Sequence, residues 1–203
     1  MRVVRLFNER FSSNCTEFFV KEIPLGLNDA QFIQSLFKPH FTTVRFEKCP
    51  FNFANFNFDF SKINLTQLIL TGCYIDIELV SLLKTVSSNL ILLDISENYV
   101  TPSIVKDIFA EIKRFTQLET LNLSRLNICY KDSGDLFNLL LNLSSLKNID
   151  LSDNPVGPTF VKCLDDCKMP LMWESLNLSK TLLDERSLLL ISLILVKLKK
   201  LKY

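Results

Sequence analysis

Leu90–Val100 reads Leu-Ile-Leu-Leu-Asp-Ile-Ser-Glu-Asn-Tyr-Val, and its pattern of apolar residues indicates the fold of the chain. Apolar residues occupy its first, fourth, sixth and eleventh positions, and an asparagine occupies the ninth. Leu146–Val156 repeats this pattern in full. Because alternate side chains of an extended strand point to opposite faces, the fourth and sixth positions predict a short strand with one buried face.

Large apolar residues fill the same positions at near-regular steps along the chain. Six copies of the pattern begin at Phe41, Leu65, Leu90, Leu118, Leu146 and Trp173. The steps between these starts are 24 to 28 residues long. Such a succession indicates an internal repeat, in which each unit buries its apolar face only against its neighbours.

The ninth position of the pattern has a predicted structural task. An asparagine there is expected to bond backbone groups of the turn that would otherwise be buried without a partner. Cys49 and Cys73 are small substitutes with a weak donor. Leu126 and Thr181 stand at this position in two copies, so we expect local irregularity there.

The remainder of each repeat predicts a helix. After Val100, Thr101 is a suitable N-cap and Pro102 a suitable first helical residue. The apolar residues that follow share one helical face: Ile104, Ile108, Phe109, Ile112 and Phe115. Leu79–Val86 and Leu136–Leu143 show similar spacing, so each repeat is expected to pair one strand with one helix.

On these repeats and their helical returns, the sequence resembles the ribonuclease-inhibitor-like leucine-rich repeat family. The resemblance implies an α/β fold, a leucine-rich repeat solenoid in the shape of a horseshoe, with a concave parallel β-sheet and convex helices. It also implies a scaffold that binds other proteins, usually in the cytoplasm. We therefore expect a cytoplasmic protein that binds a protein partner of unknown identity.

The two ends of the chain depart from the pattern. Residues 1–40 are expected to form an irregular N-terminal segment or degenerate capping repeats. A weak copy in this stretch would use Val20, Ile23, Leu25, Asn28 and Ala30. Residues 41–203 are expected to be repeats, and Leu198, Leu201 and Tyr203 begin a truncated last copy. Because an open solenoid end exposes apolar surface, we expect missing C-terminal repeats, self-association or a partner there.

Composition argues against several other classes. The 203 residues carry a net charge of +1, which gives no electrostatic footprint for nucleic acid or for an acidic membrane. The apolar run Leu188–Val196 is far shorter than the ~20 residues of a membrane-spanning helix. With four Gly and one His, neither a phosphate-binding loop nor His-based catalysis is expected. We therefore expect no enzyme and no cofactor.

No metal site is expected either. Cys163 and Cys167 lie four residues apart beside Asp165 and Asp166, which is half of a zinc-like set. No second Cys or His cluster completes it, so a structural role is favoured for both thiols. His40 has no activated nucleophile to serve as a base for.

The predicted concave face holds the candidate partner-binding residues. These are Arg45, Glu47, Ile69, Asp94, Glu97, Asn122, Arg125, Asp150, Asp153, Asn177 and Lys180. One interpretation is a solvated sheet face, and the other is a mixed-charge groove for a protein partner. Ile69, Ile91 and Leu92 are apolar at positions expected to be exposed. They mark a contact patch, or the N-terminal segment covers them.

Two other functions remain open from the sequence. One is regulation of a small GTPase or of actin dynamics on the same scaffold. The other is a secreted, glycosylated recognition domain, since Asn-X-Ser/Thr sequons occur at Asn14, Asn64, Asn122, Asn142 and Asn177. Against secretion, charges interrupt Met1–Arg10 every few residues, and no signal peptide is recognisable.

Overall fold

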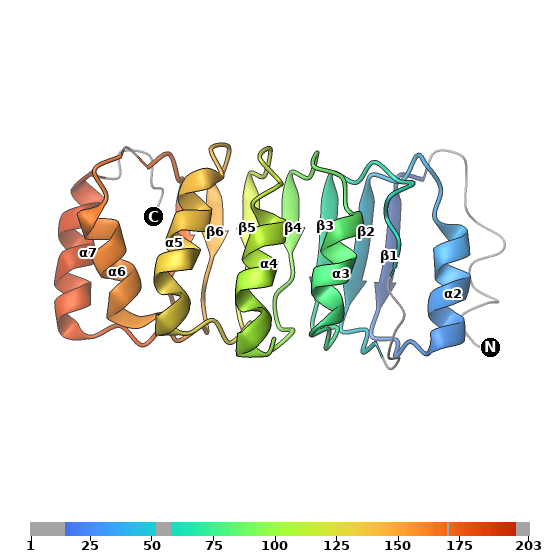
Figure 1. Cartoon of the computed structure of the whole chain (residues 1–203), viewed down its shortest axis with the longest axis horizontal. Helices are drawn as coiled ribbons and strands as arrows, with labels where there is room; N and C mark the ends of the chain where they lie inside the picture. The colour runs from blue at the N-terminus through green and yellow to red at the C-terminus, as the bar shows by residue number, and fades with distance from the viewer. Residues whose placement is uncertain (1–14, 52–57, 170, 198–203) are drawn as a thin grey trace.

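The computed structural model describes residues 15–51, 58–169 and 171–197. Within these residues, the strands form one seven-stranded sheet in chain order, and every neighbouring pair is parallel. The strands are β1 (Glu17–Lys21), β2 (Thr43–Glu47), β3 (Gln67–Thr71), β4 (Leu92–Asp94), β5 (Thr120–Asn122), β6 (Asn148–Asp150) and β7 (Ser175–Asn177). Figure 1 shows them side by side along the long axis of the molecule.

A helix follows each strand, with the exception of β2 among the described residues. The helices are α2 (Leu27–Leu36), α3 (Glu78–Thr85), α4 (Val105–Ile112), α5 (Ser133–Asn142), α6 (Gly157–Asp166) and α7 (Glu185–Lys197). All of them lie on one face of the sheet (Figure 1), which leaves the other face uncovered by helices. The expected α/β leucine-rich repeat solenoid, with a parallel sheet and convex helices, is confirmed.

The core lies between the sheet and the helices. Leu68 and Leu70 of β3 point into it and are fully buried, as are Leu93 of β4 and Leu121 of β5. Ile108, Phe109 and Ile112 of α4 join the core, as do Ile104 just before the helix and Phe115 just after it. Each repeat therefore buries its apolar side only through neighbouring repeats, as a solenoid does.

The hydrogen bonding predicted for the asparagine at the ninth position of the pattern, which we call the asparagine ladder, is confirmed at Asn98. Its Oδ1 accepts bonds from the backbone N–H groups of Cys73 and Ile75, at 3.0 and 3.2 Å. Its Nδ2 donates to the carbonyl oxygens of Leu70 and Ile95, at 2.6 and 2.8 Å. The side chain thus satisfies buried backbone groups of its own repeat and of the preceding one.

Asn154 repeats this arrangement two repeats further along the sheet. It accepts from the N–H groups of Leu126 and Ile128, and it donates to the carbonyl oxygen of Leu123. Cys73 keeps only the donor half of the task, because its thiol reaches the Phe46 carbonyl oxygen at 3.4 Å. Cysteine is therefore a partial substitute at this position.

The irregularity expected at Leu126 and Thr181 does not appear in the strand pairing. Strands β5, β6 and β7 keep the same register as their neighbours. Leu126 is buried and packs as a core residue, while the Thr181 hydroxyl donates to the Leu178 carbonyl oxygen of its own turn at 2.6 Å. Apolar packing at Leu126 and the hydroxyl bond of Thr181 thus stabilise the two repeats that lack an asparagine at the ninth position.

In the N-terminal stretch the expected register is wrong. Strand β1 pairs residue by residue with β2, so Cys15 takes the first position of the pattern and Phe18 the fourth. The weak copy that starts at Val20 is therefore displaced by five residues, and Pro24 falls after the strand, as Pro50 does. The pattern missed this copy because Cys15 is not a large apolar residue.

Phenylalanine rings fill the core of this N-terminal part. Phe46 stacks on Phe58 at 5.2 Å between ring centroids, and the Phe37 ring meets the edge of Phe18 at 5.4 Å. Helix α2 packs over this cluster, since Ala30 and Ile33 are fully buried. Residues 1–14 lie outside the described residues, as do Leu198, Leu201 and Tyr203 of the expected truncated copy.

The turn before α4 differs from the expected helix start. Pro102–Ile104 form one 3₁₀ turn, and α4 begins only at Val105. Thr101 does not cap the helix with its side chain. Instead, its backbone N–H and its hydroxyl both donate to the carboxylate of Asp76 in the preceding repeat. Because a carboxylate is a strong hydrogen-bond acceptor, Thr101 bonds to Asp76 of the neighbouring loop and does not cap the helix.

Candidate functional site

The uncovered sheet face brings the predicted central row together. Strand pairing places Arg45 beside Ile69, Ile69 beside Asp94, and Asp94 beside Asn122. Asp150 and Asn177 continue the row on β6 and β7. These side chains occupy the strand position between two buried residues, so they lie on the face opposite the helices.

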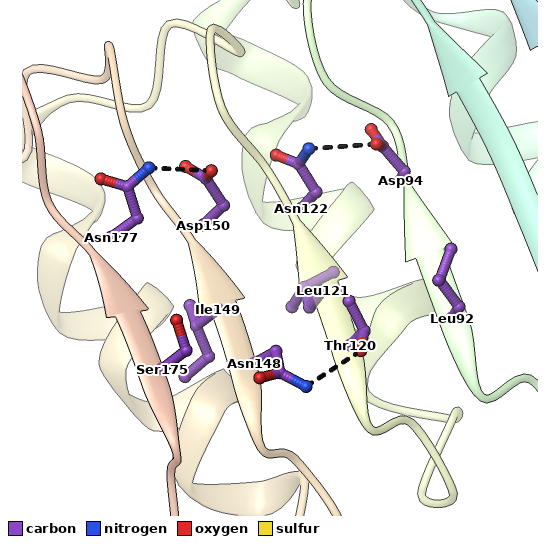
Figure 2. A pocket seen from close by; sticks show the side chains of 10 residues that line it. All are labelled: Leu92, Asp94, Thr120, Leu121, Asn122, Asn148, Ile149, Asp150, Ser175 and Asn177. Atoms are coloured by element: carbon purple, nitrogen blue, oxygen red, sulfur yellow. Dashed lines mark hydrogen bonds between the residues drawn. The ribbon is translucent and has the colours of Figure 1, made fainter. Parts of the chain in front are cut away.

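Acid and amide alternate in the C-terminal half of this row. Asn122 Nδ2 donates to Asp94 Oδ2 at 3.0 Å, and Asn177 Nδ2 donates to Asp150 Oδ2 at 2.9 Å. Figure 2 shows the two pairs in one row, the first bridging β4 and β5 and the second bridging β6 and β7. Each pair fixes the rotamers of both side chains, so the face is ordered before any partner arrives.

The same side chains also cap the ends of their strands. Asp94 Oδ1 accepts from the backbone N–H of Ser96 at 3.0 Å and from its hydroxyl at 2.6 Å. Asp150 does the same with Ser152, at 2.8 and 2.6 Å. Asn122 Oδ1 accepts from the N–H of Ser124 at 3.0 Å. The central row therefore has a local structural task in each repeat.

A hollow of about 350 Å³ lies over strands β4 to β7. Its lining residues are Leu92, Asp94, Thr120, Leu121, Asn122, Asn148, Ile149, Asp150, Ser175 and Asn177. Asn148 Nδ2 donates to the Thr120 hydroxyl at 3.3 Å on its floor. Asp94 and Asp150 supply the only formal charges among these lining residues.

A second row, at the ends of the strands, holds the remaining charged candidates. Arg125 lies between Glu97 and Asp153, at 3.4 Å from a carboxylate oxygen of each. Lys180 continues the row, with its Nζ at 3.5 Å from Asp153. We call Glu97, Arg125, Asp153 and Lys180 the ion ladder. Its charges alternate and compensate one another within the chain.

The backbone of this second row is left-handed throughout. Its φ angles are 50° at Lys48, 61° at Glu97, 54° at Arg125, 56° at Asp153 and 56° at Lys180. Gly72 occupies the equivalent position in its repeat, with φ of 64°. Sequence reasoning placed these residues on one row, but it missed their backbone conformation and their mutual pairing. The alternation of sign between successive repeats was the available signal.

The N-terminal end of the face is different in character. Arg45 pairs with Glu47, and its guanidinium carbon lies 5.2 Å from the centre of the Phe19 ring. Lys21 also pairs with Glu47, at 3.4 Å. Burial tends to raise the pKa of Glu47, but the hydrogen bonds and charges of Arg45 and Lys21 outweigh it and hold this pKa below its usual value.

The three unexpected apolar residues behave differently from one another. Ile69 is 9% exposed, while Ile91 is 43% exposed. Leu92 is partly buried and lines the hollow next to Asp94. Together with Phe19, which is 44% exposed, Ile69 and Leu92 give the face an apolar end beside its acidic half.

An exposed aromatic edge was missed by sequence reasoning. Tyr74 is 72% exposed and Tyr99 is 73% exposed, and both have left-handed backbones, with φ of 55° and 51°. They stand one residue after the ladder position, at the same edge as the ion ladder. The bonds from Thr101 to Asp76 tie their two loops together.

The other candidates lie where packing explains them. Trp173 is 3% exposed and meets Phe137 edge to face at 6.4 Å, so it belongs to the core. Cys163 and Cys167 are partly buried, and burial raises the pKa of Cys163. Within residues 15–51, 58–169 and 171–197, no group of three or more His, Cys, Asp or Glu side chains is placed to hold a metal ion.

Comparison with known proteins identifies the fold alone. No protein-family model matches this chain, and no curated protein matches it in sequence. Among the solved structures that it resembles is an internalin from Listeria monocytogenes, with 17% identity and a TM-score of 0.56. The alignment covers 91% of this chain and 46% of the internalin, so the chain spans less than half the length of that structure. This likeness supports a leucine-rich repeat fold.

Proposed function

We propose that this chain is a non-enzymatic scaffold that binds a protein partner on its concave sheet face. The observation that carries the proposal is the hollow of about 350 Å³ over β4 to β7 (Figure 2). Hydrogen bonds between strands fix its polar lining, so little side-chain freedom is left to lose when a partner binds. A face of this kind suits a macromolecular surface better than a small ligand, because it is open to solvent and spans several repeats.

We also propose that the chain belongs to the ribonuclease-inhibitor-like subclass. Convex helices of 8 to 13 residues in the repeats from β3 onward support this assignment. The repeat steps of 24 to 28 residues support it as well. A cytoplasmic location is part of the same proposal. Among the described residues, no helix is both long enough and apolar enough to cross a membrane. Regulation of a small GTPase or of actin, and secretion with glycosylation, stay as alternative predictions.

Paired affinity capture tests the scaffold proposal. The full chain is compared with Asn122→Arg, which places a large charge in the middle of the hollow, and with Ala110→Arg, which adds the same group on the exposed side of α4. A specific partner is expected with the wild type and with Ala110→Arg, and its loss is expected with Asn122→Arg. The recovered protein is then purified and titrated against all three chains. Equal affinity for the two arginine variants would rule out the concave face as the binding surface.

A further inference from the structure

We propose that Asp94 and Asp150 bind two cationic side chains, arginine or lysine, of one extended segment of the protein partner. This inference rests on the proposed function and specifies the chemistry of the same face. The segment lies across strands β4 to β6, over the hollow that both carboxylates line (Figure 2).

The fold does not require a charge at either position. Asn122 and Asn177 occupy the same place in their repeats, and each caps its strand through Oδ1 at 3.0 Å from the next serine N–H. Asp94 and Asp150 make the equivalent bonds at 3.0 and 2.8 Å. A neutral amide therefore performs the turn-capping task, and the negative charge of the two aspartates is additional to it.

These two charges also lack compensation within the described part of the chain. There, no lysine or arginine forms an ion pair with Asp94 or Asp150. The ion ladder beside them is the contrast, because Arg125 and Lys180 neutralise Glu97 and Asp153. The chain thus neutralises the carboxylates at the strand ends and leaves the two in the hollow available to an outside cation.

Both carboxylates keep room for one more donor. An ionised carboxylate has about four acceptor positions. Asp94 uses three of them, for the N–H and hydroxyl of Ser96 and for Asn122 Nδ2. Asp150 likewise bonds the N–H and hydroxyl of Ser152 and Asn177 Nδ2. An incoming guanidinium or ammonium fills the remaining position and forms a charge-assisted hydrogen bond.

The spacing selects the shape of the segment. Strands β4 and β6 are separated by one strand, so the two carboxylates stand roughly 9.5 Å apart, at about 4.7–4.9 Å per strand. In a polyproline II helix, residues three apart point the same way and are separated by about 9.3 Å. A segment with two cationic residues three positions apart therefore matches the site. Leu92, on the apolar side of Asp94, fits a proline or aliphatic residue that flanks the first cation.

Short peptides of defined sequence test the inference on the full chain. The probe is acetyl-Pro-Arg-Pro-Pro-Arg-Pro-amide. Its binding is measured by calorimetry and by the amide chemical shifts of residues 92–97, 120–125 and 148–153. Two matched peptides replace both arginines with glutamine, or place them side by side. The expected result is binding of the first peptide, about tenfold weaker binding of the adjacent-arginine peptide, and none of the glutamine peptide.

Isosteric variants identify the groups involved. Asp94→Asn and Asp150→Asn keep the turn-capping bonds but lose the acceptor for the Nδ2 of Asn122 or Asn177. Each is expected to weaken peptide binding by about tenfold, while the double variant abolishes it. Asp153→Asn removes a carboxylate of the ion ladder and is expected to leave affinity within about twofold. Affinity is also expected to fall with added salt for the wild type.

Three outcomes would overturn the inference. The first is no binding of the dibasic peptide, and the second is equal binding by the double variant. The third is spermidine binding as tightly as the peptide, which makes a small polyamine the occupant rather than a protein segment. None of these decides the scaffold proposal, because paired capture with Asn122→Arg and Ala110→Arg tests the concave face without assuming the charge of the partner.

Discussion

Asn98 Oδ1 accepts a hydrogen bond of 3.0 Å from the backbone N–H of Cys73, one repeat earlier in the chain. Four further bonds join the same amide to the backbone of residues 70, 75, 95 and 96. The side chain is 2% exposed, so water cannot replace these partners. One buried amide therefore fastens two repeats together where the strands end.

Replacing Asn98 is expected to destabilise the protein strongly. Asn98→Ala leaves several buried N–H and C=O groups without partners, and each such group costs about 1–3 kcal/mol. We expect a loss of about 3–5 kcal/mol in the free energy of unfolding, measured by urea denaturation. Asn98→Cys is the matched control, because Cys73 shows that a thiol retains the donor bond. Equal stability of the alanine and cysteine variants would contradict a stabilising role for the hydrogen bonds of the asparagine ladder.

Replacing Tyr99 is expected to have the opposite effect. A bulky residue in the left-handed region costs roughly 1–2 kcal/mol, whereas asparagine tolerates this conformation. Tyr99 is 73% exposed, so little packing is lost on replacement. Asn127 stands at the equivalent position with φ of 63°, which shows that asparagine fits there.

We therefore expect Tyr99→Asn to raise the free energy of unfolding by about 1 kcal/mol, and Asn127→Tyr to lower it by a similar amount. Thermal and urea denaturation of both variants check the two signs together. A destabilised Tyr99→Asn variant would mean that the exposed ring contributes to folding through contacts beyond its own loop.

Tyr99 and Asn127 share a left-handed backbone conformation that the sequence pattern does not predict. The repeat pattern placed Asp94, Asn122 and Asp150 on one face, because burial alternates along a strand whatever the exposed residues are. Left-handed backbone at Arg125 or Tyr99 has no such local signal, since neither residue favours it. The turn geometry is imposed by neighbouring repeats and by buried amides such as Asn98.

Side-chain partners across repeats were equally out of reach of the pattern. The spacing predicts which residues are neighbours on the sheet, but not which of two neighbours a long side chain selects. Arg125 pairs with both Glu97 and Asp153, whereas Asp94 pairs with an amide. The N-terminal copy was displaced for a different reason, because Cys15 offers too little apolar surface to mark a repeat start.

The ladder cysteines are expected to resist alkylation in the folded protein. Burial raises the pKa of Cys73 to about 12 and also raises that of Cys49, so neither thiol ionises near neutral pH. Iodoacetamide at about pH 8.5 is expected to label the partly buried Cys15 and to spare both ladder thiols until urea is added. Peptide mass spectrometry measures each site. Labelling of Cys73 at equal rates in native and unfolded chains would contradict this.

The same pKa shift predicts a loss of stability at alkaline pH. An unfolded cysteine ionises at roughly pH 8.5, while folded Cys73 stays protonated up to about pH 12. Stability is therefore fully present below the lower value and falls as pH rises between the two. Between about pH 8 and pH 10.5, the free energy of unfolding is expected to fall less for Cys73→Ala than for the wild type. Urea denaturation at both pH values measures the difference.

The position of Arg125 between Glu97 and Asp153 predicts a salt-dependent effect of charge reversal. Each ion pair of a partly exposed arginine contributes about 0.2–1 kcal/mol, and Arg125→Glu replaces both pairs with repulsion along the whole ladder. We expect a loss of about 1–2 kcal/mol in the free energy of unfolding at low salt, and most of it should disappear near 1 M NaCl, where the Debye length is about 3 Å.

Lys113→Glu is the matched reversal for this experiment. Lys113 is exposed at the end of α4 and forms no ion pair within the part of the chain that the structure describes. Because Lys113 is the C-cap of α4, this variant reports the effect of changing the net charge by two together with that of a carboxylate at the C-terminal end of a helix. If Lys113→Glu and Arg125→Glu lose the same stability with the same salt dependence, the ion ladder adds no stability of its own to the fold. A loss confined to Arg125→Glu means that the alternating charges hold neighbouring repeats together, and that Glu97 and Asp153 are already committed within the chain.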